Sequence, residues 1–441
     1  MAQQMKESGS DWIGIIPDDW KIVRMKACVS QRDSGSWGSD ACGDSGDTIC
    51  LRIADFDYSK YRFKNTPEEE LTWRNYKEDV VEKLTLKKND IVIEKSGGGE
   101  KTPVGRTVIF DKDYKALYAN FCDRIRCREI VNPEFLQYIF VTFYANRFVW
   151  NYIKQTTGIQ NLDLTSMLSQ EKVALPSIKK QEAIVSFLNN ECKKIESAYD
   201  ATIKSIDEYK KLKQAVVTKA VTKGIKNINK TKNSGSVWFD EIPENWDMKK
   251  LKYMFHIKKD IAGEEGYTVL SITQKGIIPK DLSKNEGQLA ANYSNYQLVA
   301  PGDFAMNHMD LLTGWVDISK YSGVTSPDYR VFVLDDATSN DSRYFLYMMQ
   351  MCYSNRIFYG LGQGVSGLGR WRLQADKFLN FMIPVPPKEE QSEIADYLDN
   401  RCTEIDNLIE MKEAFLEELD NYKKSLIYEY VTGKKEVPAC Y

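Results

Sequence analysis

The sequence has few of the residues that usually build catalytic and metal sites. It contains two histidines among 441 residues, His256 and His308, and they lie far apart. The nine cysteines form no Cys-x-x-Cys pair, so the paired ligand spacing of a zinc site is missing. An odd number of cysteines without a secretory signal favours reduced thiols in a cytoplasm. We therefore expect no metal site and a cytoplasmic location.

A long apolar run is also missing. The opening residues, MAQQMKESGSDW, contain no apolar core of a signal peptide. The two most apolar stretches, FLQYIFVTFYANRFVWNYI and YFLYMMQMCYSNRIFYGLG, are interrupted by Asn and Arg. They predict buried aromatic helices, so no membrane partner is expected. The length of 441 residues suits two domains.

No strong positive charge marks the chain as a whole. The net charge is −3, which gives no global argument for nucleic-acid binding. A DNA-binding role would require basic residues that are locally concentrated, or that a partner supplies. Lysines far outnumber acids in residues 204–233. This stretch is either a solvated helix end that leads into a linker or a contact to phosphates.

What the sequence does have is an internal repeat. DWIGIIPDDWKIVRMK (residues 11–26) returns as VWFDEIPENWDMKKLK (residues 237–252). LPSIKKQEAIVSFLNNECKKIE later returns as VPPKEEQSEIADYLDNRCTEID. The aromatic stretches between these two segments also match, since Tyr144, Asn146 and Arg147 correspond to Tyr353, Asn355 and Arg356. A common frame with divergent interiors suggests two similar domains that read different things.

Each half ends in a predicted long helix. Residues 180–221 contain no Pro or Gly, and apolar residues recur every three or four positions in both copies. A helix of about 42 residues spans roughly 60 Å. We expect the two helices to pack on each other, antiparallel if a pseudo-two-fold axis relates the halves. The alternative is two separate helices, each covering its own domain.

Two glycine-rich segments are candidate ligand loops. GQGVSG fits G-x-G-x-x-G but lacks the preceding strand and following crossover helix of a dinucleotide site. SGGGEKTPVGR follows NDIVIEK, a predicted strand, and is no Walker A loop. Its glycines either allow close backbone approach to a ligand or form a flexible hairpin loop.

Motifs for catalysis are missing as well. We find no Asn/Asp-Pro-Pro-Tyr motif of a methyltransferase, SPDY at residues 326–329 being only superficially close, and no spaced acids and Lys of a nuclease. We therefore predict no catalytic residue in this chain.

The sequence resembles the specificity subunits of type I restriction-modification systems along nearly its whole length. Four features carry the resemblance: the paired IP-x-x-W segments, the SGGGEKTPVGR loop, the GVSGLGRWRLQADKF run, and the twin P-x-x-x-x-Q-x-x-I segments that open the long helices. The resemblance implies an α+β fold with a pseudo-two-fold internal repeat. In it, two similar mixed α/β target-recognition domains are joined by two long helices that form an antiparallel coiled coil.

The implied boundaries are residues 1–178 for the first target-recognition domain, 179–223 for the first long helix, 224–236 for a linker, 237–387 for the second domain, 388–432 for the second helix and 433–441 for a tail. The partners implied are double-stranded DNA, methyltransferase subunits and endonuclease/translocase subunits. S-adenosylmethionine, ATP and Mg would be used by those partners, and this chain would hold no cofactor. Each domain would read one half of a split, asymmetric DNA site.

Two sets of residues are the candidates for these roles. The DNA-binding candidates are Gly97, Gly98, Gly99, Lys101, Arg106, Gln160 and Asn161 in the first domain and Asn307, His308, Gln363, Arg370 and Arg372 in the second. Arg suits guanine edges and phosphates, and Gln and Asn suit adenine, although each could instead be a solvated or turn-capping residue. His308 lies in AMNHMDLLTGW, which we expect in the slot of the first domain's glycine loop. Replacing Arg370 should relax specificity at one half-site if it reads a base, and weaken binding uniformly if it contacts phosphate.

For partner docking, the predicted helix residues are Ile184, Leu188, Ile195, Ile394, Leu398 and Ile405. Two alternative hypotheses for the function remain. One is an interaction protein that docks methyltransferase without reading DNA. The other, which the missing motifs disfavour, is an enzyme in its own right.

Overall fold

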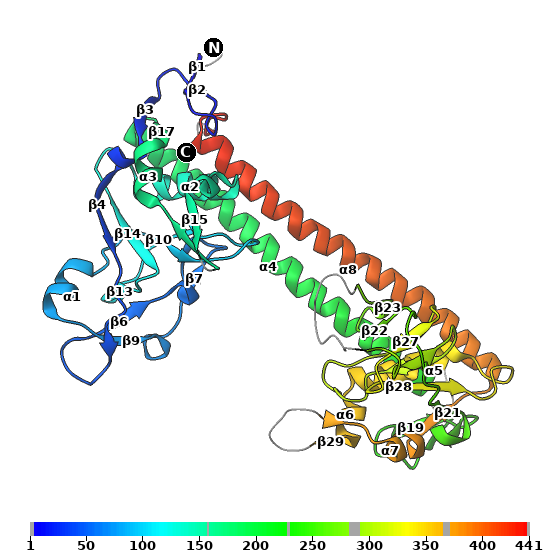
Figure 1. Cartoon of the computed structure of the whole chain (residues 1–441). Helices are drawn as coiled ribbons and strands as arrows, with labels where there is room; N and C mark the ends of the chain where they lie inside the picture. The colour runs from blue at the N-terminus through cyan, green and yellow to red at the C-terminus, as the bar shows by residue number, and fades with distance from the viewer. Residues whose placement is uncertain (1–3, 157, 227–229, 282–291, 365–370, 439–441) are drawn as a thin grey trace. The chain divides into compact units, whose positions relative to one another are not determined.

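The computed structural model describes residues 4–156, 158–226, 230–281, 292–364 and 371–438. The chain divides into two compact units, Met1–Ile203 with Glu413–Tyr441, and Lys204–Lys412. Each unit contains one mixed α/β domain and part of both long helices (Figure 1). The repeat seen in the sequence is therefore a repeat of structural units.

The first unit is built on a six-stranded sheet and a four-stranded sheet. Strand β10 lies between β14 and β12 in the larger sheet. Its residues Ile91, Val92 and Ile93 are all buried, which is the pattern of a strand covered on both faces. The larger sheet has the order β4 (Val29–Ser34), β14 (Cys122–Cys127), β10 (Ile91–Glu94), β12 (Thr107–Ile109), β8 (Arg62–Phe63) and β7 (Phe56–Asp57). The smaller has β13 (Ala116–Tyr118), β6 (Asp47–Leu51), β9 (Trp73–Asn75) and β5 (Ser39–Asp40). The predicted strand in NDIVIEK is confirmed.

Smaller elements complete this unit. Pairs form between β1 (Met5–Glu7) and β2 (Ile15–Pro17), and between β3 (Lys21–Arg24) and β17 (Lys172–Leu175). The helices are α1 (Glu78–Leu84), α2 (Pro133–Ala145) and α3 (Leu164–Gln170). Asn132 begins α2 because its side chain accepts hydrogen bonds from the backbone of Glu134 and Phe135, and Pro133 suits the first helical position. The first aromatic stretch is thus a buried helix, as expected.

The second unit is built on a different set of sheets. Its main sheet has the order β21 (Phe255–Lys258), β28 (Arg330–Leu334), β25 (Phe304–Met306) and β26 (Val316–Ile318). Two-stranded pairs are β18 (Thr231–Asn233) with β19 (Glu241–Pro243), β20 (Asp247–Lys250) with β31 (Met382–Val385), β22 (Leu270–Thr273) with β23 (Gly276–Pro279), and β24 (Gln297–Val299) with β27 (Gly323–Thr325). The helices are α5 (Ser342–Ser354), α6 (Ile357–Leu361) and α7 (Ala375–Asn380). The aromatic helix α5 is the counterpart of α2.

The strand registers align the two domains residue by residue. Ile93 of β10 is opposite Asp123 of β14, and Met306 of β25 is opposite Arg330 of β28. The Leu162 amide donates to the Lys95 carbonyl at 2.8 Å, and the Leu373 amide donates to the His308 carbonyl at 3.0 Å. His308 therefore occupies the place of Lys95, at the start of the glycine loop, as expected for its segment.

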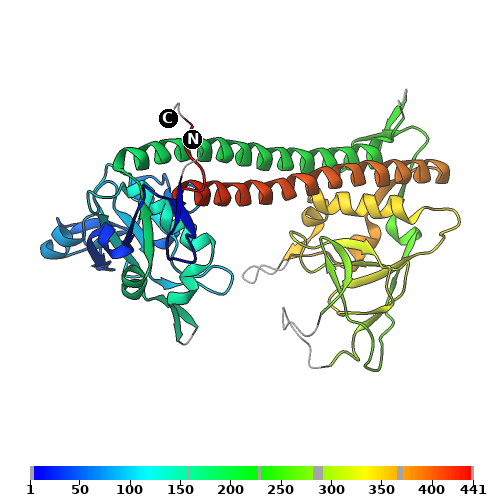
Figure 2. The same ribbon diagram turned by 90° about the horizontal axis from the view of Figure 1, so that it is seen from above.

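The long helices are α4 (Ile178–Lys223) and α8 (Lys388–Val431), within one residue of the predicted bounds. They run side by side and antiparallel (Figure 2). In the first unit the Phe187 and Tyr430 rings lie 4.5 Å apart, and in the second unit Lys213 lies 2.6 Å from Asp406. The antiparallel pairing is thus confirmed inside each unit. Among the described residues, no helix is long and apolar enough to cross a membrane.

A buried glutamine explains the repeated P-x-x-x-x-Q pattern. The Gln181 carbonyl oxygen accepts from the Asn132 amide at 2.8 Å, while its amide donates to the Pro176 carbonyl at 3.0 Å. Gln391 does the same in the second unit, accepting from the Asp341 amide at 2.9 Å. Each glutamine joins the start of a long helix to the cap of the aromatic helix. It satisfies buried polar groups that would otherwise destabilise the core.

Candidate nucleic-acid interface

A three-stranded sheet brings two predicted segments of the first domain together. Strands β15 (Ile153–Thr156) and β16 (Ile159–Leu162) form a hairpin, and β11 (Ser96–Gly97) pairs with β16. Ser96 lies opposite Asn161 and Gly97 opposite Gln160. The glycine loop and the Gln160–Asn161 pair, far apart in sequence, are therefore one surface.

Only one residue of that pair faces outward. Successive side chains of a strand point to opposite faces, so Asn161 is exposed while Gln160 is 0% exposed. The Gln160 carbonyl oxygen accepts from the Val104 amide at 3.3 Å. This corrects the prediction for Gln160, because a side chain in the core cannot reach a base edge. Asn161 accepts from the Ser96 hydroxyl at 2.7 Å through its carbonyl oxygen.

The three glycines have different roles. A Cβ on Gly98, where φ is +66°, would lie 2.8 Å from the Val104 nitrogen and 2.9 Å from the Gln160 oxygen. Gly98 therefore packs against the loop itself. Gly97 and Gly99 face open space, and Lys101 is exposed. Close approach of a ligand at Gly97, Gly99 and Lys101 stays a prediction.

Arg106 is committed to an internal ion pair. Its Nε and Nη2 donate to the two carboxylate oxygens of Glu94 at 2.9 and 2.8 Å, and its guanidinium lies 3.6 Å from the centre of the Tyr58 ring. Glu94 is 2% exposed. The Arg106 side chain is 25% exposed, so the ion pair fixes the position of the guanidinium, and contact of Arg106 with DNA stays a prediction.

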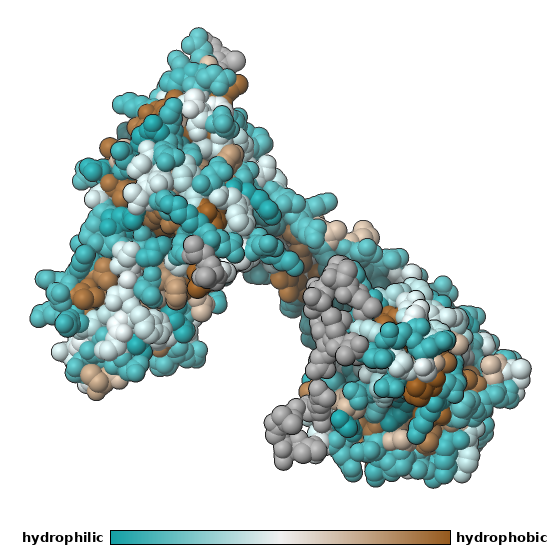
Figure 3. All heavy atoms as spheres, viewed as in Figure 1, coloured by the Kyte–Doolittle hydropathy of each residue, from teal (hydrophilic) through white to brown (hydrophobic). Residues whose placement is uncertain are grey.

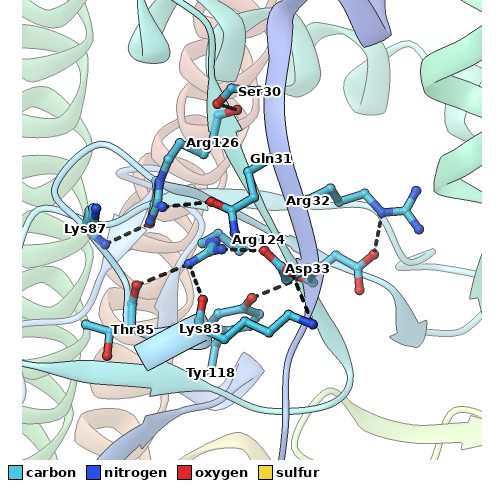
Figure 4. A network of polar contacts seen from close by, with 12 residues as sticks. Ser30, Gln31, Arg32, Asp33, Lys83, Thr85, Lys87, Tyr118, Arg124 and Arg126 are labelled. Atoms are coloured by element: carbon cyan, nitrogen blue, oxygen red, sulfur yellow. Dashed lines mark hydrogen bonds and ion pairs between the residues drawn. The ribbon is translucent and has the colours of Figure 1, made fainter. Parts of the chain in front are cut away.

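Basic residues of the six-stranded sheet also form ion pairs. Figure 4 shows the buried Arg124 beside Asp33, with its Nη1 donating to the carbonyls of Lys83 and Thr85 at 3.2 Å each. Asp123, fully buried, lies 3.2 Å from both Lys95 and Arg32. The positive charges of β14 and β4 therefore stabilise the sheet, and the exposed loop and hairpin residues remain the candidates for DNA.

The second domain has the corresponding hairpin. Strands β29 (Gln363–Gly364) and β30 (Trp371–Arg372) pair with Gln363 opposite Arg372, and both of these side chains are exposed. Arg372 stands where the first domain has Asn161, two residues that suit different bases. Arg370 lies outside the described residues.

The glycines of this hairpin make room for an indole. Trp371 stacks on Tyr359 at 5.4 Å and donates to the Tyr359 carbonyl at 2.6 Å. A Cβ on Gly362 or Gly364 would come within 2.4 or 2.2 Å of the Trp371 ring. The G-x-G-x-x-G match is thus explained by packing in the residues that the structure describes.

One buried charged position has the opposite sign in the two domains. The position of Asp123 is taken by Arg330, which is 5% exposed and donates to the Leu373 carbonyl at 2.9 Å. Burial lowers the pKa of Arg330 to about 10. Burial, and then the charges of Arg330 and Arg372, lower the pKa of His308 to about 4. His308 is therefore neutral at pH 7.

Asn307 forms a turn. Its side-chain oxygen accepts from the amides of Met309 and Asp310 at 3.2 and 3.3 Å, and its carbonyl accepts from the Tyr353 hydroxyl at 2.8 Å. The half-buried Asn307 shapes the loop that carries His308. Contact of either side chain with DNA stays a prediction.

The predicted docking residues lie in the cores. Ile184, Leu188, Ile195, Ile394, Leu398 and Ile405 are all 8% exposed or less, and all except Ile405 belong to the hydrophobic core of their own unit. This corrects their assignment, because a partner cannot contact buried side chains. Other large apolar side chains of the helices are exposed: Tyr199, Ile203, Phe415 and Tyr422 in the first unit, and Leu212, Leu408 and Met411 in the second. Figure 3 shows hydrophobic surface over the middle of α4.

Both halves match one family model. The model, described as the type I restriction modification DNA specificity domain, matches residues 50–207 and 243–420, well over half of the chain. The chain belongs to this family. The matched ranges include the glycine loop, both hairpins and most of the two long helices.

Relatives extend the match. The MjaVIII specificity subunit of a type I restriction enzyme from Methanocaldococcus jannaschii is 25% identical over 319 residues, which cover 67% of this chain and 70% of that protein. A second protein of that archaeon, provisionally named the MjaX specificity subunit, is 24% identical over 447 residues and covers 96% of each chain. A solved chain from work on complex assembly and conformational transition of the type I R-M system has a TM-score of 0.66 at 13% identity, covering 95% of this chain and 99% of that chain. This last similarity concerns the fold.

Proposed function

We propose that the chain is the DNA-reading subunit of a type I restriction-modification complex and recognises a bipartite, asymmetric site in double-stranded DNA. One observation carries the proposal. The family domain occurs twice on a common frame, yet the equivalent residues around the two hairpins differ in chemistry: Asn161 against Arg372, Lys95 against His308, and Asp123 against Arg330.

These differences have a direct consequence for recognition. Asn pairs well with the N6 and N7 edge of adenine, and Arg with the O6 and N7 edge of guanine. Two domains with different exposed hairpin residues read different half-sites. We therefore expect the two halves of the DNA site to differ in sequence.

The chemistry belongs to partners in this proposal. Methyltransferase subunits would use S-adenosylmethionine, and endonuclease/translocase subunits would use ATP and Mg. This chain contributes sequence recognition and no catalytic group. Purified alone, it should not consume S-adenosylmethionine.

Methylation mapping tests the proposal. We would co-express the chain with its cognate methyltransferase and sequence the genomic adenine methylation, with a strain that lacks the chain as control. A split motif with two unlike halves, present only with the chain, is the expected result. Co-purification without any motif would instead favour the second candidate, a protein that docks methyltransferase without reading DNA.

Arg372→Ala should alter one half of that motif. Loss of a base contact costs about 1–3 kcal/mol of discrimination, so the second domain's half-site should become degenerate at one position. The first domain's half-site should stay unchanged in the same methylation map, which supplies an internal control. A motif unchanged in both halves would remove Arg372 from the base-reading residues.

We propose that the exposed apolar residues of α4 and α8 dock the methyltransferase. Met411 is 67% exposed and Phe415 is 43% exposed, one turn apart on α8. Met411→Lys or Phe415→Lys should weaken methyltransferase binding about thirtyfold, since a buried anchor contributes on the order of 2 kcal/mol.

The measurement is the affinity between the purified chain and methyltransferase. Asn421→Lys is the matched control, because Asn421 is exposed on the same helix and lies about 120° around it from Phe415. Equal affinity for all three variants would place the docking surface elsewhere.

A further inference from the structure

Two grooves occupy equivalent positions in the two units. The first, the α2 groove, has a volume of about 300 Å³ and lies between the end of α2 and part of α8. The second, the α5 groove, has a volume of about 1110 Å³ and lies between α5 and part of α4. Six positions are shared through the repeat: Val141, Tyr144, Ala145, Arg147, Asp420 and Lys424 in the first, and Gln350, Tyr353, Ser354, Arg356, Lys210 and Gln214 in the second.

An arginine with a strained backbone marks each groove. Arg147 has φ 62° and Arg356 has φ 57°, the left-handed region in which Gly and Asn are the favoured residues. The turn after the aromatic helix requires this backbone, but it does not require a long charged side chain. Both arginines are exposed and form no ion pair with the part of the chain that the structure describes. Strain that persists in two divergent domains indicates a function.

Both grooves are basic although the chain is acidic overall. The α2 groove is lined by four cationic side chains and one carboxylate, and the α5 groove by five cationic side chains and two carboxylates. Four of these cations form ion pairs: Arg106, Lys424, Lys213 and Arg343. The other cations, two in the α2 groove and three in the α5 groove, give each groove its positive charge. Lys101 accompanies Arg147, and Lys210 and Lys275 accompany Arg356, as exposed cations without an ion pair among the described residues.

A tyrosine connects each groove to a recognition loop. The Tyr144 hydroxyl donates to the Pro103 carbonyl at 3.1 Å, in the glycine loop. The Tyr353 hydroxyl donates to the Asn307 carbonyl at 2.8 Å, in the loop of His308. An anion held in either groove would thus lie at a fixed position relative to the loop that carries candidate base contacts.

We infer that the α2 and α5 grooves each bind the phosphate backbone of the DNA, independently of its sequence. This inference rests on the proposed function and adds the residues that position the duplex. Since the proposed half-sites differ, exposed cations kept at the same place in both domains fit a ligand that is the same in both halves. The phosphate backbone is such a ligand, and basic grooves suit it. Lys210 and Lys213 belong to the lysine-rich stretch of residues 204–233, and both line the α5 groove.

The test uses variants that keep the backbone conformation. Arg147→Asn and Arg356→Asn remove the charge but favour a positive φ, so the turn is preserved. Lys115→Ala and Lys320→Ala are the matched controls, since both lysines are exposed and outside the groove linings. Affinity of the complex with methyltransferase is measured by fluorescence anisotropy from 0.05 to about 0.3 M salt, a range that resolves the slope. One duplex contains the methylated motif and another lacks it.

Each Asn variant should lower the slope of log affinity against log salt by about 0.9 and weaken binding about eightfold at 0.1 M salt. The factor should be equal on both duplexes, and the methyltransferase content of the complex should not change. Arg147→Lys and Arg356→Lys should keep most of the wild-type slope. An unchanged slope in the Asn variants, an equal loss in the Lys variants, or loss of methyltransferase, which would indicate a protein ligand, would each overturn the inference.

The two proposals can fail separately. If the wild-type complex prefers the motif but the Asn variants keep its slope, the groove assignment is wrong and the reading function stands. If the wild-type complex shows no preference between the duplexes but the Asn variants reduce the slope, the reading function is wrong and the grooves bind phosphate.

Discussion

Arg106→Met is expected to lower the free energy of unfolding of the first unit by about 3 kcal/mol, because breaking a buried ion pair leaves an uncompensated charge. Glu94, which is 2% exposed, would lose both hydrogen bonds from the guanidinium and keep those from the Tyr58 hydroxyl and the backbone amide of residue 106. Methionine has a similar length, so most of the packing against Tyr58 should remain. The effect should therefore be electrostatic.

Urea unfolding of the purified chain measures this loss. The double variant Arg106→Met/Glu94→Gln should recover part of the stability, since the stranded group is then neutral. Arg128→Met is the control, because Arg128 is exposed and its Nε donates only to the Val29 carbonyl at 3.0 Å. Unchanged stability together with an altered methylation motif would instead support Arg106 as a DNA-reading residue.

The second unit should lose stability as the pH falls from about 6.5 to about 4, and His308 should account for up to about 3 kcal/mol of this loss. Burial lowers the pKa of His308 from 6.5 to about 4 in the folded chain. Between these values the unfolded chain binds a proton that the folded chain does not. The contribution of His308 is therefore fully present above pH 6.5 and is lost as the pH falls toward 4.

The slope of unfolding free energy against pH identifies the group. His308→Gln should flatten it within this window, and Arg330→Met should flatten it in part, because the charge of Arg330 helps to lower the pKa of His308. His256→Gln is the control, since the His256 side chain is 59% exposed. A slope that is the same in wild type and His308→Gln would show that His308 does not titrate abnormally.

Most of the fold could be predicted from the sequence because the repeat supplies long-range information. The matched Trp20 and Trp246 are both buried, at 1% and 0% exposed, in equivalent cores. The spacing of Ile184 and Leu188 predicted a helix, and the equal lengths of the two copies predicted their pairing. Antiparallel order then followed from symmetry, without any knowledge of individual contacts.

The site was harder to predict because side-chain orientation depends on strand register. Gln160 and Asn161 are neighbours with similar chemistry, and only the pairing with Ser96 and Gly97 decides which one is buried. Arg106 looked like a free loop residue because Glu94, its partner across the turn, is not recognisable as such in the sequence.

The docking residues show a similar limit. Periodicity showed that the helices have an apolar stripe, but it did not show what covers the stripe. In the structure the domains themselves cover Ile184 and Ile394, which leaves residues outside the strict pattern, such as Met411 and Phe415, at the surface. Orientation toward the chain's own domain and orientation toward a partner give the same sequence pattern.

A lysine at the end of each long helix donates to a backbone carbonyl in an entry segment of the repeat. Lys223, the last residue of α4, donates to the Glu241 carbonyl at 2.6 Å, 18 residues away. Lys434, just after α8, donates to the Ile15 carbonyl at 2.5 Å, 419 residues away. Ile15 and Glu241 are equivalent in the repeat, so one contact forms with a covalent connection nearby and again without it. Each unit therefore has its own contact between the end of a long helix and an entry segment of the repeat. We therefore expect a circular permutant opened at residues 224–236 to keep both contacts.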